Sequence, residues 1–85
     1  MREDFIEYLD DVQNMIFSHD FQNASKTFVD KMYLWEKVIS TMTEENIMGF
    51  NNIMLEVFTA QQKEDFLLMA DLFEYRVKPF ITSLK

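Results

Sequence analysis

The chain has 85 residues, of which 48% are hydrophobic and 15% aromatic, so its composition is that of one folded domain and not of a disordered segment. A single glycine and a single proline leave few residues for the tight turns of an all-β protein. The net charge of −7 would repel phosphate backbones, which argues against nucleic-acid binding. Because the chain has no cysteine, it has neither disulfides nor a thiolate metal site.

The first half of the chain predicts two helices, over residues 3–18 and 21–42. In the first, apolar residues recur at spacings of three and four from Phe5 onwards, as on one face of a helix. Asp20 is the expected N-cap of the second. The second helix has the strongest apolar repeat of the chain, at Phe21, Ala24, Phe28, Met32, Trp35, Ile39 and Met42. Trp35 lies in the middle of this repeat and is expected in the core.

The second half predicts two more helices, over residues 44–60 and 65–84. Thr43 and Asp65 are the expected N-caps, since their side-chain oxygens can accept from the unpaired N–H groups of a first turn. Pro79 removes a backbone donor and crowds the preceding turn, so the last helix is expected to be kinked there.

Together these elements predict a single all-α domain over residues 1–85, a four-helix up-down bundle built of two αα-hairpins. The pair Asp20-Phe21 recurs as Asp65-Phe66, 45 residues later (65 − 20), and apolar positions align at the same offset. The repeat has two explanations, a duplicated hairpin or the shared period of any two helices, and the second is favoured.

The closing run Leu68-Met69-Ala70-Asp71-Leu72-Phe73-Glu74-Tyr75, followed by Pro79, resembles the end of a group of small helical-bundle proteins from Gram-positive bacteria. The stretch from Phe28 to Trp35 is similar in style to their second helix. These proteins have no assigned function, so the resemblance implies a helical bundle and a bacterial source, and it carries no site residues to this chain.

The sequence offers little that could be catalytic, and it predicts no enzyme, cofactor or metal. Ser18, His19 and Asp20 are adjacent, so they cannot converge as nucleophile, base and orienting acid. His19 is the only histidine, and a single glycine cannot form a phosphate-binding loop. Asp71, Glu74 and Tyr75 are the only candidates for a chemical role, with Asp71 expected to be partly buried.

The apolar residues outside the helix stripes predict a surface that needs a partner. The run Phe66 to Ala70 is apolar around its whole circumference, and a bundle covers only the inward side of each helix. A homodimer is expected, because one patch then serves both subunits. The candidate interaction surface comprises Tyr33, Leu34, Phe58, Phe66, Leu67, Asp71 and Tyr75.

The favoured function is a non-enzymatic protein-interaction module, in the style of small acidic chaperones. The alternatives are a structural subunit that self-associates and an enzyme regulator with Asp71, Glu74 and Tyr75 at its site. The start Met1-Arg2-Glu3-Asp4 has no apolar core of a signal peptide, and no run reaches the ~18 apolar residues of a membrane span. A cytoplasmic protein away from membranes is therefore expected.

Overall fold

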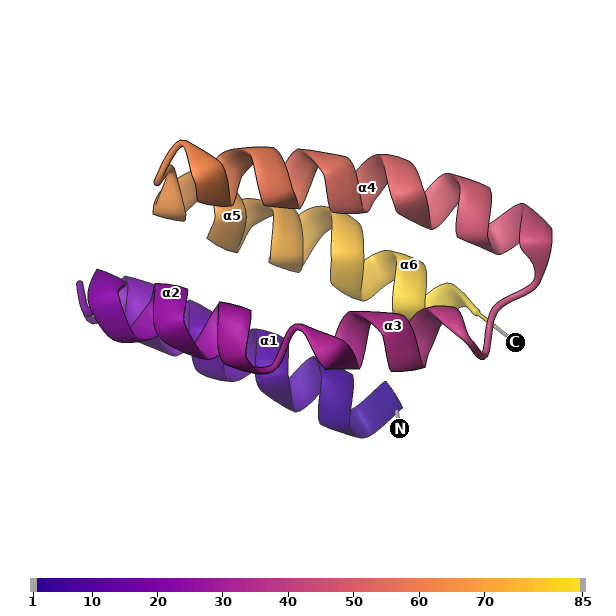
Figure 1. Cartoon of the computed structure of the whole chain (residues 1–85), viewed down its shortest axis with the longest axis horizontal. Helices are drawn as coiled ribbons and strands as arrows, with labels where there is room; N and C mark the ends of the chain where they lie inside the picture. Colours follow the sequence, from indigo (N-terminus) through magenta and orange to yellow (C-terminus); the bar gives the residue numbers. More distant parts are fainter. Residues whose placement is uncertain (1, 85) are drawn as a thin grey trace. The chain divides into compact units, whose positions relative to one another are not determined.

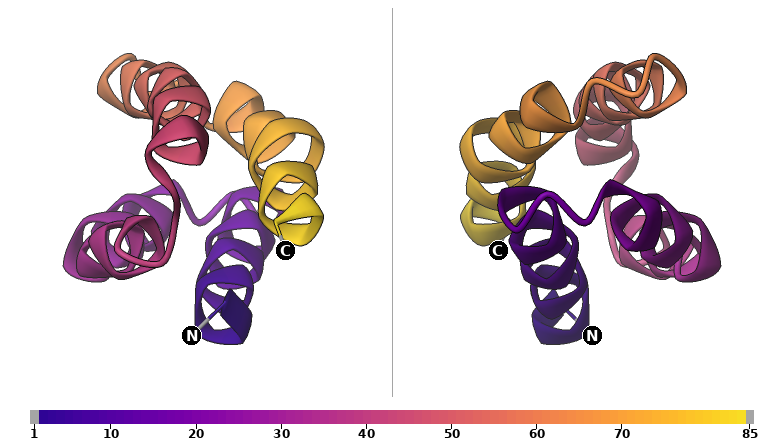
Figure 2. Two further views of the ribbon diagram at one scale, coloured as in Figure 1. Left: turned by 90° about the vertical axis from the view of Figure 1, so that its right-hand side faces the viewer. Right: turned by 90° about the vertical axis from the view of Figure 1, so that its left-hand side faces the viewer.

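The computed structural model describes residues 2–84, and every regular element within them is helical. The all-α class predicted from the sequence is confirmed. The chain divides into two compact units, unit 1 up to Met42 and unit 2 from Thr43. In each unit one long helix is followed by a second, interrupted helix that returns beside it (Figures 1 and 2).

Unit 1 contains α1 (Arg2–Phe17), α2 (Phe21–Asp30) and α3 (Tyr33–Ile39). The prediction of one continuous helix over 21–42 was wrong, because the chain breaks at Lys31–Met32 and α3 ends at Ile39. At the break, the N–H groups of Met32, Leu34 and Trp35 bond three residues back instead of four. At the end of α3, the hydroxyls of Ser40 and Thr41 donate to the carbonyls of Lys37 and Val38. The apolar spacing runs through both points and gives no sign of them.

The buried phenol of Tyr8 joins all three helices of unit 1. Its hydroxyl donates to the Phe28 carbonyl at 2.8 Å and accepts from Trp35 Nε1 at 3.1 Å. Phe5 completes the aromatic cluster, with its ring edge-to-face on Trp35 at 4.9 Å between centroids. Trp35 is 1% exposed, which confirms its expected place in the core.

The break in the second predicted helix leaves a backbone carbonyl without its helical donor, and the Tyr8 hydroxyl donates to that carbonyl. In a continuous α-helix the Phe28 carbonyl would accept from the Met32 N–H, which here bonds to the Val29 carbonyl. The Tyr8 hydroxyl donates to that carbonyl instead. Burial away from water raises the pKa of Tyr8 well above the ordinary range of tyrosine, although the hydrogen bond from Trp35 acts in the opposite direction.

Unit 2 contains α4 (Glu44–Gln62), α5 (Phe66–Leu72), the π-helical segment η1 (Phe73–Val77) and α6 (Lys78–Ser83). The expected N-caps Thr43 and Asp65 accept from the N–H groups of Asn46 and Leu68. The buried side chains of the unit are mostly apolar, namely Phe50, Ile53, Val57 and Ala60 on α4 and Met69, Ala70, Leu72, Phe73, Val77 and Ile81 on the returning segment. Gly49 lets the ring of Phe80 approach α4, since a Cβ there would lie 3.3 Å from Phe80 Cε2.

The last helix departs from α geometry before Pro79 and not at it. The Lys78 N–H bonds to the Phe73 carbonyl, five residues back, which widens the turn into η1. Pro79 then lies in the first turn of α6, where a missing N–H costs little. A proline ring clashes with the carbonyl four residues back, and a widened turn gives that carbonyl room. The expected irregularity is present, but it covers Phe73–Val77.

The two hairpin turns have the same hydrogen bonds and the same backbone conformation. The N–H groups of His19 and Asp20 bond to the carbonyls of Ile16 and Met15, in the pattern of a Schellman C-cap. Every bond recurs 45 residues later, where Glu64 and Asp65 bond to Gln61 and Ala60. His19 and Glu64 both adopt positive φ, at 60° and 56°. Each turn therefore ends one helix and caps the next with an aspartate.

We predict that Tyr8→Phe lowers the free energy of unfolding by about 1–3 kcal/mol, because the Trp35 N–H and the Phe28 carbonyl each lose a buried partner. The wild-type protein should also lose stability as the pH rises above about 10, since the unfolded chain then releases the tyrosine proton that folded Tyr8 keeps. Tyr8→Phe should lack this additional alkaline loss. Urea titrations at pH 8 and pH 11 measure both effects, with the exposed Tyr75→Phe as control. Equal stabilities of the two variants at pH 8 would contradict the bonding of the hydroxyl.

We also predict that Glu64→Gly raises the free energy of unfolding by about 0.5–1 kcal/mol, because glycine adopts positive φ without the steric cost of a Cβ. His19→Gly should gain less, since the His19 ring also contacts Phe21, at 5.8 Å between centroids. The control is Gln62→Gly, at the last residue of α4, where glycine should destabilise the helix. Thermal melts compare the three variants. A lower melting temperature for Glu64→Gly would show that its positive φ is not strained.

Candidate interaction groove

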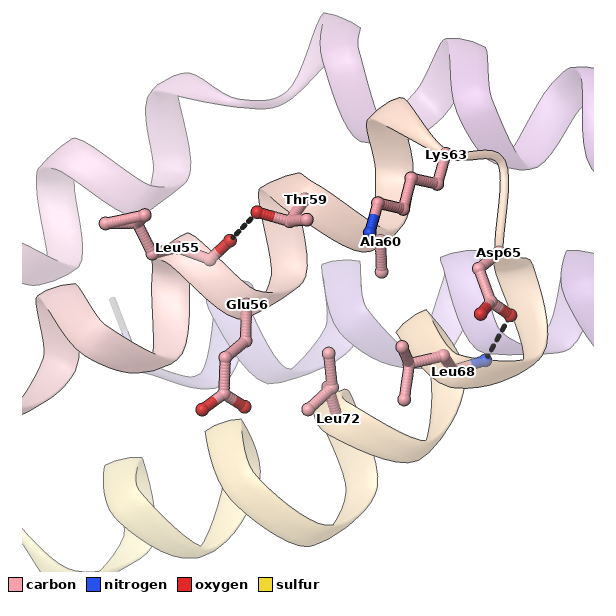
Figure 3. A pocket seen from close by; sticks show the side chains of 8 residues that line it. All are labelled: Leu55, Glu56, Thr59, Ala60, Lys63, Asp65, Leu68 and Leu72. Atoms are coloured by element: carbon pink, nitrogen blue, oxygen red, sulfur yellow. Dashed lines mark hydrogen bonds between the residues drawn. The ribbon is translucent and has the colours of Figure 1, made fainter.

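A groove with a volume of about 410 Å³ lies between α4 and α5, within unit 2 (Figure 3). Its lining comes from one face of α4, the turn that follows it, and α5. The residues are Leu55, Glu56, Thr59, Ala60, Lys63, Asp65, Leu68 and Leu72.

The lining is largely apolar. Ala60 and Leu72 are nearly buried, at 2% and 9% exposed, whereas Leu55 and Leu68 are 65% and 45% exposed. The hydroxyl of Thr59 donates to the Leu55 carbonyl of its own helix at 2.7 Å, so it adds little polarity to the groove. Two large leucine side chains thus remain in water at the edges of a small apolar hollow.

The local sequence explains why the groove forms. Leu55 and Thr59 follow one another at four-residue spacing, so they line one side of α4, and Lys63 continues this spacing directly after the end of the helix. The turn then reverses the chain, and the Asp65 carboxylate accepts from the Leu68 N–H at 3.3 Å to start α5. This cap places Leu68, and one turn later Leu72, alongside that face of α4. The small side chain of Ala60 leaves the space between the two helices.

Charged side chains stand at the edges of the groove. Glu56 Oε2 accepts from Arg76 at 3.2 Å, and both side chains are about half exposed. The Asp65 carboxylate caps α5. Lys63 makes no ion pair with any residue of the described part of the chain, positions 2–84. One cation of the groove is therefore not paired within it.

A second hollow, of about 250 Å³, lies in unit 1 and has a different chemistry. Carboxylates of α1 line it together with two lysines, Lys31 at the helix break and Lys37 in α3. Lys37 Nζ lies 5.4 Å above the ring of Tyr33. The lining comprises Asp4, Glu7, Tyr8, Asp11, Lys31, Tyr33, Leu34 and Lys37. This hollow is mainly charged and offers little apolar surface to a partner.

The structure agrees with only part of the interaction surface expected from the sequence. Tyr33, Leu67 and Tyr75 are exposed, at 52%, 62% and 73%. Phe58 and Phe66 are half-buried. The placement of Leu34 on this surface was wrong, because its side chain is only 9% exposed. None of these residues lines the groove of unit 2, and Tyr33 and Leu34 belong to unit 1.

The three residues considered for a chemical role lie on the outside of unit 2. The expectation that Asp71 is partly buried was wrong, because its side chain is exposed. Glu74 pairs with Lys78 at 3.3 Å, one turn further along the helix. Tyr75 is 73% exposed. These are not the desolvated groups in a cleft that acid–base chemistry uses.

The sequence reasoning missed Leu55 and Leu68, the two exposed leucines of the groove. Leu55 does carry a signal, because it stands between Ile53 and Val57 of the buried face and must point elsewhere on the helix. Leu68 is hidden within the apolar run that begins at Phe66. Only the pairing of α4 with α5 shows that the two leucines border one hollow.

Comparison with known proteins identifies a family whose function is unknown. The model of the family described as Domain of unknown function (DUF8042) matches residues 1–85. The chain belongs to this family. No curated protein and no solved structure matches it.

Within residues 2–84, no group of three or more His, Cys, Asp or Glu side chains is placed to hold a metal ion. In the same residues, no helix has the length and apolar character needed to cross a bilayer.

Proposed function

We propose that this DUF8042 chain is a non-enzymatic protein-interaction module, chaperone-like in style, of the bacterial cytoplasm. The groove between α4 and α5 carries the proposal. Leu55 and Leu68 border it in water, and a buried alanine provides room for a leucine-sized side chain. A hollow of this kind suits helix-in-groove recognition, in which an amphipathic helix places its apolar side chains between two helices.

The proposal includes the arrangement of the two hairpins as a four-helix up-down bundle. Each hairpin alone has about half the chain, close to the lower limit of ~40 residues at which a domain can still have enough core to fold by itself. The matching turns at His19-Asp20 and Glu64-Asp65 support two similar hairpins that bury their apolar faces against each other. They also favour a duplicated hairpin over a coincidence of helix period.

The alternatives draw on other features. A self-associating structural subunit, and in particular a homodimer, is supported by the exposed leucines, because apolar side chains at the edge of a hollow suit contact with another copy. An enzyme regulator acting through Asp71, Glu74 and Tyr75 has weaker support, since all three lie on an open helix face. Neither a cofactor nor a nucleic acid is part of the proposal.

Affinity capture with the full chain tests the interaction module. We expect the tagged protein to retain specific proteins from a lysate of its source cells, and the substitution of Leu55 or Leu68 by Glu to abolish that retention, because a carboxylate would have to be desolvated in the groove. Tyr33→Glu, which changes an exposed side chain of unit 1, should leave retention unchanged. Mass spectrometry quantifies the captured proteins, and thermal melts confirm folding. Retention that survives both leucine variants would contradict the role of the groove.

A further inference from the structure

The C-terminal end of α4, together with Lys63 directly after it, carries opposite charges placed symmetrically about two small residues on the side of the groove. Glu56 and Lys63 are seven residues apart (63 − 56), which is two helical turns, or roughly 10 Å, along the same side of the helix. Their midpoint falls between Thr59 and Ala60, where small side chains allow another helix to approach. Both charges line the groove (Figure 3).

These two charges are also able to take a further partner. Lys63 has no ion pair among residues 2–84. Glu56 uses Oε2 for Arg76, while its side chain stays 44% exposed, so Oε1 remains available to a donor from outside. A carboxylate accepts several hydrogen bonds at once.

This arrangement is what a two-fold axis requires. Suppose that a second copy lies antiparallel to the first, with the two-fold axis at the midpoint between Thr59 and Ala60. Residues at equal distances on either side of this midpoint then face each other, so that the numbers of each facing pair sum to 119. Glu56 of each copy therefore faces Lys63 of the other (56 + 63). Leu55 of one copy then faces position 64 of the other and lies next to Leu68, at the end of its groove. The exposed leucines of the two copies would cover one another. A foreign helix would need no such symmetry.

We propose that the occupant of the groove is the C-terminal end of α4, with Lys63 after it, of a second copy of this chain, packed antiparallel about a two-fold axis at Thr59–Ala60, with Glu56 of each copy paired to Lys63 of the other. The inference rests on the proposed function, because it names the partner of the same groove. The net charge of −7 on each copy opposes the association. At 0.15 M salt this repulsion is screened beyond about 8 Å, whereas close pairs at a partly buried interface keep much of their strength.

Sedimentation equilibrium of the full chain, from 1 to 100 μM in about 0.15 M salt, tests the pairing by charge reversal. We expect the wild-type protein to form a dimer, and its dissociation constant to rise at least tenfold in Glu56→Lys and in Lys63→Glu. Each single substitution creates two contacts between like charges, because the contact between positions 56 and 63 occurs twice in a two-fold dimer. The double variant E56K/K63E restores opposite charges, and its dissociation constant should return to within about threefold of wild type. A double variant as weak as the single ones overturns the pairing, and so does a wild-type monomer at 100 μM.

Matched controls separate the pairing from general charge and from folding. Glu7→Lys and Lys26→Glu make the same charge changes at exposed positions of unit 1 and should leave the dissociation constant within threefold of wild type. Arg76→Gln removes the internal partner of Glu56 and should also leave the dimer intact. If a reversal unfolds the chain, Glu56→Gln and Lys63→Gln replace it, with a smaller weakening expected. Equal weakening by the unit 1 controls overturns the inference.

The two proposals fail in different ways. A wild-type monomer whose captured proteins are lost in Leu55→Glu would overturn the second copy as occupant and leave the interaction groove standing. A dimer that persists in every groove variant would place the self-association elsewhere on the chain. That result overturns the inference whatever the capture experiment shows.

Discussion

The fold depends on a turn that uses no glycine. In both hairpins the chain must stop one helix, reverse and start the next within three residues, and it does so by placing His19 or Glu64 in the left-handed region. The following aspartate closes the Schellman bonds with its N–H and caps the next helix with its carboxylate. Because the turn fixes where the second helix begins, it determines which apolar residues meet across each hairpin. In unit 2 it also sets Leu68 opposite α4, and so creates the groove.

The second helix of each hairpin is interrupted in a different way. In unit 1 the helix tightens at Lys31–Met32, where the Met32 N–H bonds to Val29 and not to Phe28. The Tyr8 hydroxyl donates to the Phe28 carbonyl in its place. In unit 2 the chain widens into η1 and thereby accommodates Pro79. A tightened or a widened turn rotates the residues that follow it about the helix axis, so that different side chains face the core. Residues at the 45-residue offset beyond these points therefore differ, as with Leu34, which is buried, and Pro79, which is exposed.

Local signals in the sequence predicted the helices and the caps, because these depend on residues within one or two turns of each other. Asp20, Thr43 and Asp65 each accept the expected N–H bond. The break at Lys31–Met32 could not be predicted in this way, since it involves a hydroxyl 20 residues from the carbonyl it binds. The groove depends in the same way on the contact between two helices. Sequence patterns therefore indicated exposed apolar residues, but not the pair, Leu55 and Leu68, that borders one hollow.

The central claim is that the groove face of α4 and α5 is where this chain meets its partner. A dilution series followed by ¹H–¹⁵N correlation spectra of the labelled full chain tests it residue by residue. The account predicts concentration-dependent shifts of the backbone amides between Leu55 and Leu72, with amides of unit 1, such as those of Phe17 and Lys26, unaffected. Shifts centred on unit 1, or none at concentrations where the protein sediments as a dimer, would contradict it.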